Sequence, residues 1–348
     1  MSHFWNTTSI IGLSPMDGVT DAAFRKIVDL HGKPQLLVTE FIPVEGITRG
    51  AVQILKSFIH HKTDTPTLGQ IYGTDLDAYR QATLIVCELG FDGVDINMGC
   101  PDRSISGRGA GAGLIRTPEL ARDIIATVKQ AVHDWSEGLT LEDVGLRPSI
   151  IDHVRAIANR CDIDTSSRIG IPVSVKTRTG YDQIQTQEWI SHIIEARPAA
   201  ITLHGRTLAQ MYTGLASWDE IGKAAELARD AGIPFLGNGD IKSRAEALDK
   251  IKQYGLSGVL IGRAAFGNPW IFQGTEPTAY ERLQTALQHA QMFEELLPDG
   301  HFLSIRKHLA WYTKGFDQAA ETRARLMSVN NSSEIKEILE PFLKQFAE

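Results

Sequence analysis

The sequence is short of cysteine and of long apolar runs, and each shortage excludes a class of protein. The 348 residues include only 3 Cys, with no C-x-x-C pair, which excludes a disulfide-stapled secreted scaffold. The N-terminus has no basic region followed by a long apolar run. No stretch approaches the roughly 18 apolar residues of a membrane-spanning helix. We therefore expect a cytoplasmic protein with no membrane partner.

An excess of positive charge is also missing. Lys and Arg number 35 against 42 Asp and Glu, a formal net charge of −7, so no global basic field indicates nucleic-acid binding. Apolar residues make up 43% of the chain and charged residues 22%, which is typical of a globular protein. At about 100–200 residues per domain, the length predicts about two domains.

What is present is a regular alternation of apolar runs and helical segments, several of which end in Gly. The apolar, β-branched runs cover residues 9–16, 36–42, 66–72, 93–99, 172–178, 199–206, 234–240 and 258–264. Near-continuous apolar strands, each followed by a helix, indicate a parallel sheet that is buried on both faces. Eight such units predict an α/β fold of the (β/α)8 TIM barrel type, with a doubly wound open sheet as the alternative.

The strand pattern stops after about residue 275, and residues 276–348 are typical of helices only. We predict a barrel domain over 1–275 followed by a small all-helical C-terminal domain over 276–348. Residues 134–170 lengthen one connection by an acidic stretch and one helix. Because this insert follows a helix and precedes a strand, we expect it at the N-terminal face of the barrel, away from the chemistry.

Polar residues gather at the C-terminal ends of the predicted strands, where (β/α)8 enzymes place their active sites. The candidates are Met16, Asp17, Glu40, Gln70, Asn97, Cys100, Lys176, Arg178, His204, Arg206, Asn238, Asp240, Gly262 and Arg263. This set has no obvious carboxylate pair for glycoside hydrolysis and no Cys and His spacing for zinc, so we expect no metal. Cys87 and Cys161 are expected to be small core residues.

The last two predicted strands end in G-N-G-D (237–240) and I-G-R-A-A-F-G (261–267). Loops after these two strands form the usual phosphate-binding site of the fold, so we expect a phosphate-bearing ligand here. Tight turns that need Gly for a positive φ are the alternative interpretation. We expect residues 100–114 to form a mobile loop over the barrel mouth, or simply a flexible connection.

Six motifs occur at these strand ends: S-P-M-D-G-V-T-D (14–21), D-I-N-M-G-C-P (95–101), V-K-T-R-T-G (175–180), L-H-G-R-T (203–207), G-N-G-D-I (237–241) and I-G-R-A-A-F-G-N-P-W-I-F (261–272). Together and in this order they closely resemble the tRNA-dihydrouridine synthases, a family of FMN-containing (β/α)8 barrels with a helical tRNA-binding domain. R-K-H-L-A-W-Y-T-K-G-F (306–316) resembles the family signature in that domain.

The resemblance implies reduction of the C5–C6 double bond of specific tRNA uridines to 5,6-dihydrouridine, with FMN as cofactor and NADPH as reductant. It places Pro15, Met16, Asp17, Gln70, Lys176, His204, Asn238, Gly239, Asp240, Gly262 and Arg263 at the cofactor. Hydride would pass from reduced FMN to C6, and Cys100 would give the proton to C5. A thiol with a pKa of about 8.5 is mostly protonated at pH 7, so this role needs no depressed pKa. Asn97 and Arg178 would contact the uracil, which must flip out of the tRNA.

The implied tRNA contacts in the helical domain are Arg306, Lys307 and Lys314. Residues 299–326 hold five Lys and Arg against three Asp and Glu, whereas 134–170 holds four against seven, so an acidic chain still has a local basic face. The alternative interpretation is that these charged residues form a solvated helix face with no ligand.

Two other functions are compatible with parts of the sequence. One is an FMN barrel that reduces a small molecule such as a free pyrimidine, and the basic helical domain argues against it. The other is a catalytically silent RNA-binding barrel, and the presence of Cys100 and Lys176 argues against that. We expect a monomer.

Overall fold

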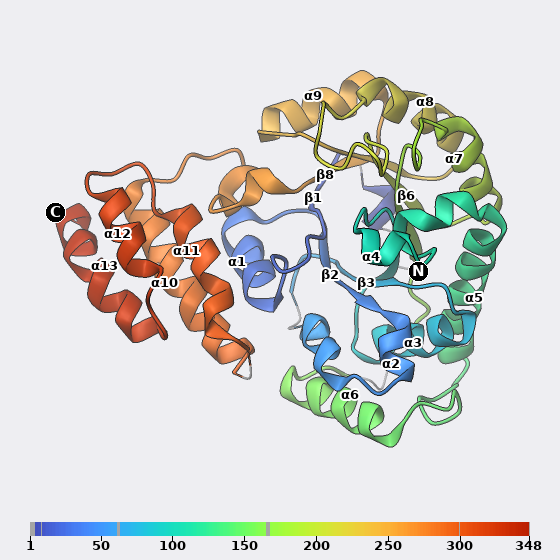
Figure 1. The fold of residues 1–348 in the computed structure, drawn as a ribbon, viewed down its shortest axis with the longest axis horizontal. Helices are drawn as coiled ribbons and strands as arrows, with labels where there is room; N and C mark the ends of the chain where they lie inside the picture. Colours follow the sequence, from blue (N-terminus) through green and yellow to red (C-terminus); the bar gives the residue numbers. More distant parts are fainter. Residues whose placement is uncertain (1–3, 8, 61–62, 165–167, 299, 348) are drawn as a thin grey trace.

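The computed structural model describes residues 4–7, 9–60, 63–164, 168–298 and 300–347 (Figure 1). Its sheet consists of β1 (Ile10–Leu13), β2 (Leu37–Pro43), β3 (Thr67–Tyr72), β4 (Gly93–Met98), β5 (Val173–Arg178), β6 (Ala200–His204), β7 (Phe235–Asn238) and β8 (Gly258–Ile261). All neighbouring strands are parallel, in the order β1-β8-β7-β6-β5-β4-β3-β2. A parallel bridge between Gly12 and Leu36 brings the two outermost strands together, and the Leu13 N–H donates to the Leu36 carbonyl at 2.8 Å.

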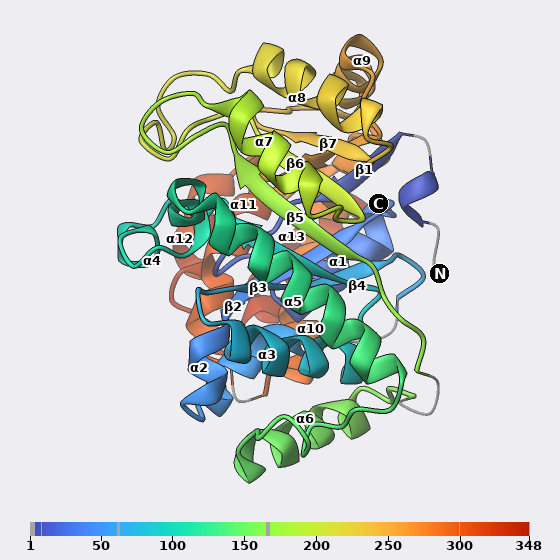
Figure 2. The ribbon, with the colours of Figure 1, turned by 90° about the vertical axis from the view of Figure 1, so that its right-hand side faces the viewer.

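Helices surround the sheet as a second layer (Figures 1 and 2). They are α1 (Ala22–Gly32), α3 (Leu76–Glu88), α5 (Pro118–Ser136), α7 (Thr186–Glu195), α8 (Trp218–Asp230) and α9 (Arg244–Tyr254). Asp21, Asp75, Ser217 and Ser243 cap four of these helices, each accepting a bond from a first-turn N–H. The predicted (β/α)8 fold is confirmed.

Two of the repeated units depart from the regular pattern. β2 is followed by the short α2 (Val44–Thr48) and the 3-10 helix η2 (Val52–Phe58) rather than by one long helix. β8 is followed by the 3-10 helices η4 (Arg263–Ala265) and η5 (Pro269–Phe272). α1 packs against η5 and against the first helix of the C-terminal segment, so that segment covers the flank of the barrel at this point.

The barrel interior changes from apolar to polar along the strand direction. A buried cluster at the N-terminal end contains Trp5, Ile10, Leu36, Val38, Leu68, Ala200, Leu236 and Leu260. Side chains on a strand alternate between its two faces, so the residue two places after an inward one also points inward. Two places after Leu68 stands Gln70, and two places after Leu236 stands Asn238. The alternation of side chains along each strand therefore gives the barrel interior an apolar N-terminal end and a polar C-terminal end, which we call the mouth.

The insert within residues 134–170 forms α6 (Pro148–Arg160), which contacts α3 and η2 (Figure 2). Arg147 Nε donates to the Thr48 carbonyl at 3.0 Å. Arg160 donates to the Glu295 carbonyl at 3.1 Å. α6 thus packs outside the helical ring, and residues 165–167 of the insert lie outside the described residues.

The C-terminal segment is all helical and extends from the barrel beside α1 (left in Figure 1). Its helices are α10 (Ala279–Leu296), α11 (Arg306–Tyr312), α12 (Ala319–Leu326) and α13 (Ser332–Ala347). Thr278 and Glu281 form a capping box at the start of α10. Among the described residues, no helix is both long and apolar enough to cross a membrane.

Candidate active site

The strand register brings predicted site residues side by side at the C-terminal ends of the strands. Gln70 pairs with Asp95 across β3 and β4, and Asn97 with Lys176 across β4 and β5. Arg178 pairs with His204, and His204 with Asn238. Residues as far apart in the chain as Gln70 and Asn238 therefore line one mouth.

Two side-chain amides connect the interior to the segment after β4. Asn97 Nδ2 donates to Gln70 Oε1 at 2.9 Å. Asn97 Oδ1 accepts from the backbone N–H groups of Gly99 at 3.0 Å and of Cys100 at 2.9 Å. Asn97 therefore fixes the backbone that carries the candidate acid.

Asp95 is a site residue that the sequence candidates did not include. It is buried, and its carboxylate accepts from Gln70 Nε2 at 2.5 Å and from Ser174 Oγ at 2.6 Å. Burial raises the pKa of Asp95, while these two hydrogen bonds and the Lys176 cation oppose the rise. The sequence signals were its place at the start of the motif over residues 95–101 and its spacing of two residues from Asn97, which puts it on the same side of β4.

Cys100 lies at the mouth with its side chain enclosed. The residue is 8% exposed. Burial is the main influence on its thiol and raises the pKa of Cys100, so the group carries its proton at neutral pH. Gly111 closes over it with φ +56°, and a Cβ added there would lie 3.0 Å from Cys100 Cβ. Cys87 and Cys161 are buried away from the strand ends, as expected.

The segment after Cys100 is folded rather than irregular. It forms α4 (Arg103–Ser106) and the 3-10 helix η3 (Gly111–Arg116), and residues 111–115 are buried. Backbone contacts such as the 3.2 Å bond from the Ala112 N–H to the Cys100 carbonyl hold it down. Within the expected loop over residues 100–114, residues 110–114 are therefore packed into the site, whereas residues 102–104, 107 and 108 are exposed.

Arg178 joins the ends of β4 and β6 from its place on β5. Its Nε donates to the Gly99 carbonyl at 2.6 Å and its Nη1 to the Thr207 carbonyl at 3.1 Å. Burial lowers the pKa of Arg178 to about 10, so the guanidinium is still charged at neutral pH. Among the described residues no group accepts from Nη2 of this buried cation, so Nη2 is open to a ligand.

Lys176 and His204 share a strongly cationic environment. Burial, with Arg178 adjacent, lowers the pKa of Lys176 to about 8. Burial and the cations Arg178, Lys176 and Arg206 hold the pKa of His204 well below its usual value, so this imidazole is neutral. In the described chain no side chain accepts a hydrogen bond from Lys176 Nζ. This site is electrostatically suited to a negatively charged ligand.

Asp240, which follows β7, binds two arginines. Arg206 follows β6, and Arg263 follows β8. Arg206 Nη2 donates to Asp240 Oδ2 at 2.7 Å, and Arg263 Nη2 donates to Asp240 Oδ1 at 2.8 Å. Although burial acts against it, bonds from the Ala216 N–H and from Arg206 keep the pKa of Asp240 below its usual value. Asp240 thus positions Arg206 and Arg263, and Arg206 is itself 2% exposed with an unpartnered buried Nε.

The two glycine loops meet at this triad. Gly239 has φ +135°, and a Cβ added there would lie 2.5 Å from Ala216 Cβ, so only glycine fits. Asn238 is buried and donates from Nδ2 to the Leu260 carbonyl at 2.8 Å, which fixes β7 to β8. Within the described chain, no group accepts from the backbone N–H of Gly239, Asp240, Gly262 or Arg263. Four open amides and a guanidinium at one place suit a phosphate.

The turn after β1 forms the adjoining part of the rim, because β1 pairs with β8. Met16 lies against Gly262, because a Cβ added to that glycine would lie 3.4 Å from Met16 Sδ. Pro15 and Met16 are half-buried, whereas Asp17 is exposed. The turn therefore borders the same opening as the β8 loop.

Glu40, a strand-end candidate, lies on β2 below this turn. It is buried and accepts from Ser57 Oγ at 3.3 Å. Burial and the neighbouring Asp21 raise its pKa to about 7, with Arg25 opposing.

The three cations of the helical segment have different surroundings. Arg306 is half-buried and donates to the Val329 carbonyl from Nε at 3.0 Å and from Nη2 at 2.8 Å. Lys307 Nζ donates to the Gly18 carbonyl in the turn after β1. Lys314 is exposed, and burial of part of its side chain with Arg282 nearby lowers its pKa. Of the three, Lys314 has its charge open to solvent.

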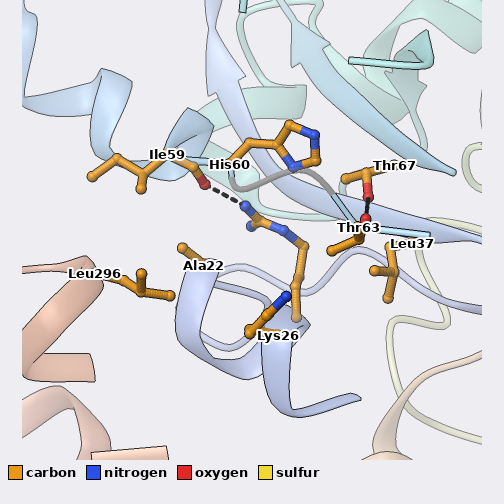
Figure 3. Close-up of a pocket in the computed structure, with 9 residues that line it drawn as sticks. Ala22, Lys26, Leu37, Ile59, His60, Thr63, Thr67 and Leu296 are labelled. Carbon is orange, nitrogen blue, oxygen red and sulfur yellow. Dashed lines mark hydrogen bonds between the residues drawn. The ribbon is translucent and has the colours of Figure 1, made fainter. Parts of the chain in front are cut away.

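A small enclosed cavity lies outside this mouth, between α1, the segment before β3 and the end of α10. It is lined by Ala22, Arg25, Lys26, Leu37, Ile59, His60, Thr63, Thr67 and Leu296 (Figure 3). Its volume is about 10 Å³, so it admits no more than a water molecule. The Ile59 carbonyl in Figure 3 accepts from Arg25 Nη2 at 2.6 Å. This cavity is a packing gap, not a ligand site.

Comparisons with known proteins agree with the geometry. The model of the dihydrouridine synthase (Dus) family matches residues 12–139 and 152–347. The "probable tRNA-dihydrouridine synthase" of Staphylococcus epidermidis RP62A is 30% identical, over 98% of this chain and 96% of the relative. The "probable tRNA-dihydrouridine synthase 2" of Bacillus subtilis 168 is 29% identical, over 96% and 94%.

One solved structure supports the fold alone. It is DHODH from Eimeria tenella in complex with ferulenol, with a TM-score of 0.51 and 12% identity, over 81% of this chain and 82% of that one. The family match covers most of the barrel and the helical segment, and it leaves out residues 1–11, residues 140–151 of the insert and residue 348. The chain belongs to the dihydrouridine synthase (Dus) family.

Proposed function

We propose that this protein reduces the C5–C6 double bond of specific uridines in tRNA, with Cys100 as the acid that protonates C5. The observation that carries the proposal is a protonated, enclosed thiol whose backbone is fixed by Asn97 beside a cationic mouth. The names of the relatives, which are dihydrouridine synthases, support the substrate class. General acid catalysis needs a proton donor with a pKa near or above the working pH, and this thiol has it.

The residues present suit FMN as the cofactor. Lys176 Nζ has no hydrogen-bond partner in the described chain, and this residue lies in register with Asn97 on the adjacent strand. Gly239, Asp240, Gly262 and Arg263 offer open amides and a guanidinium for the phosphate, and Pro15, Met16 and Asp17 border the same opening. When bound and reduced by NADPH, FMN would supply the hydride for C6 of the uracil.

Around that cofactor, each of this chain's residues has a distinct task. Gln70, Lys176 and neutral His204 would contact the polar edge of the ring, and Asn238 holds β7 against β8 beneath it. Asp240 would act indirectly, by holding Arg206 and Arg263 toward the phosphate. Among the described residues, one N–H of Asn97 Nδ2 and the Nη2 group of Arg178 have no acceptor, and these would bind the uracil.

We propose the helical segment 276–348 as the tRNA-binding domain and residues 1–275 as the catalytic domain. Lys314 is the exposed cation of the predicted trio. Lys307 would act through its bond to the Gly18 carbonyl, which ties α11 to the rim of the mouth. Arg306 would hold the residues after α12 in place.

The test is single-turnover reduction of tRNA by the flavin-loaded protein and its Cys100→Ala variant. We expect the single-turnover rate constant to fall by about 10²–10⁴-fold with the flavin retained, because only the proton donor is lost. Cys87→Ala, at a buried helical cysteine, is the matched control and should retain its rate within about twofold. An unchanged rate in Cys100→Ala would place the acid elsewhere.

A further inference from the structure

The chain of hydrogen bonds beneath Cys100 has a fixed direction. The backbone N–H groups of Gly99 and Cys100 can only donate, so the atom of Asn97 that faces them must be oxygen. At the other end, both oxygens of the Asp95 carboxyl group accept, Oδ1 from Ser174 Oγ and Oδ2 from Gln70, so the atom of Gln70 that faces Asp95 is nitrogen.

The contacts at both ends of the chain of hydrogen bonds require the same donor and acceptor in the bond between Asn97 and Gln70. With its nitrogen toward Asp95, Gln70 presents Oε1 to Asn97. With its oxygen toward the backbone, Asn97 presents Nδ2 to Gln70, and the bond between these atoms is 2.9 Å long. A flip of either amide would set two donors or two acceptors against each other, at a cost comparable to a lost buried hydrogen bond.

Asp95 is suited to set this direction because it is itself held rigidly. It is 3% exposed, and Ser174 Oγ binds its second oxygen at 2.6 Å. The relay Asp95–Gln70–Asn97 then runs across β3 and β4 to the backbone of Cys100, with all three side chains buried.

We infer that Asp95 is a positioning residue that holds Gln70 and, through the bond between Gln70 and Asn97, supports the place of the Cys100 thiol. The inference rests on the proposed function only in that Cys100 is there the proton donor. The experiment that tests it does not measure uridine reduction. Gln70 Nε2 and Asn97 Nδ2 each use one N–H in the relay, and each leaves its second N–H for the ring of a bound flavin or uracil. Asp95 thus decides which groups the mouth presents without touching a ligand.

The experiment measures how fast iodoacetamide alkylates Cys100 in the folded protein, in a background carrying Cys87→Ala and Cys161→Ala. Asp95→Leu removes the acceptor, and we expect alkylation about tenfold faster because the Cys100 backbone loses its anchor. Asp95→Asn keeps an oxygen for Gln70 and can donate to Ser174, so its rate should stay within about twofold of the parent.

Two further variants keep the inference falsifiable. Ser174→Ala removes the other bond to the same carboxylate and should also stay within about twofold. Gln70→Met breaks the relay one residue later and should match Asp95→Leu. If Asp95→Leu does not fold, a parental rate in Gln70→Met still overturns the inference, because it shows that the relay does not hold Cys100 in place. Parental rates in the relay-breaking variants would overturn the inference, as would an Asp95→Asn rate equal to that of Asp95→Leu. Because alkylation needs neither FMN nor tRNA, failure here is separable from a lack of uridine reduction.

Discussion

At the residue scale, the mouth combines a thiol that holds its proton with a neutral imidazole and cations that hold their charge. Burial acts in opposite directions on these groups, since it raises the pKa of Cys100 and lowers those of Lys176 and His204. Lys176, with a pKa of about 8, is still mostly charged at pH 7. One enclosed environment therefore yields a donor, a neutral ring and an anion-binding cation together.

Gly239 gives a residue-scale prediction about the phosphate loop. Gly239→Ala puts a Cβ 2.5 Å from Ala216 Cβ at φ +135°. We expect the free energy of unfolding to fall by about 2–4 kcal/mol and FMN retention to fall with it. Gly138→Ala is the control: its φ is +113° but nothing lies within 4 Å, so strain alone should cost about 1 kcal/mol. Equal losses in urea unfolding of the two variants would contradict the close approach.

At the element scale, the sequence predicted the strands well and the side-chain partnerships poorly. The eight apolar runs correspond to β1–β8, because a strand covered on both faces must be apolar throughout. The strand ends also located most of the mouth. What local pattern could not reveal were pairings across strands, such as Asp95 with Gln70 or Asp240 with Arg206. Those depend on register, which is set by the closed barrel.

The interface between α1, α10 and α11 gives an element-scale prediction about pH. His289 and His308 are buried there beside Phe24, and both nitrogens of His308 lack a partner in the described chain. Burial lowers the pKa of His289 to about 3 and holds that of His308 well below its usual value. Both pKa values are lower in the folded than in the unfolded chain. The free energy of unfolding therefore has its full value, as far as these two histidines are concerned, above about pH 6.5, and it falls as the pH drops below 6.5.

We expect the folded protein to lose about 1.4 kcal/mol per pH unit for each of these histidines below pH 6.5. His308→Leu should flatten the dependence, as measured by melting temperature between pH 7.5 and 5. His301→Ala, at an exposed position, should leave the slope unchanged. A slope that His308→Leu does not alter would show that other groups govern acid stability.

At the scale of the whole molecule, the net charge of −7 is compatible with an RNA substrate because charge is unevenly distributed. The acidic insert packs on the outside of α3 and η2, whereas the helical segment packs on α1 and reaches the mouth through Lys307. A phosphate backbone would then meet cations on the helical segment and around the mouth.

Lys314→Glu tests this arrangement. We expect weaker tRNA binding at low salt and a smaller dependence of the affinity on salt, because one phosphate contact is lost. Lys223→Glu makes the same charge change on α8 and should alter binding little. Filter binding at several salt concentrations measures both variants, and equal effects would mean that only the overall charge matters.

The central claim is that this chain reduces tRNA uridine by means of Cys100. The most direct measurement maps dihydrouridine position by position in tRNA from cells with the protein, without it, and with Cys100→Ala in its place. The account predicts that one or a few D-loop positions lose dihydrouridine both without the protein and with Cys100→Ala. An unchanged dihydrouridine map in cells without the protein would contradict it.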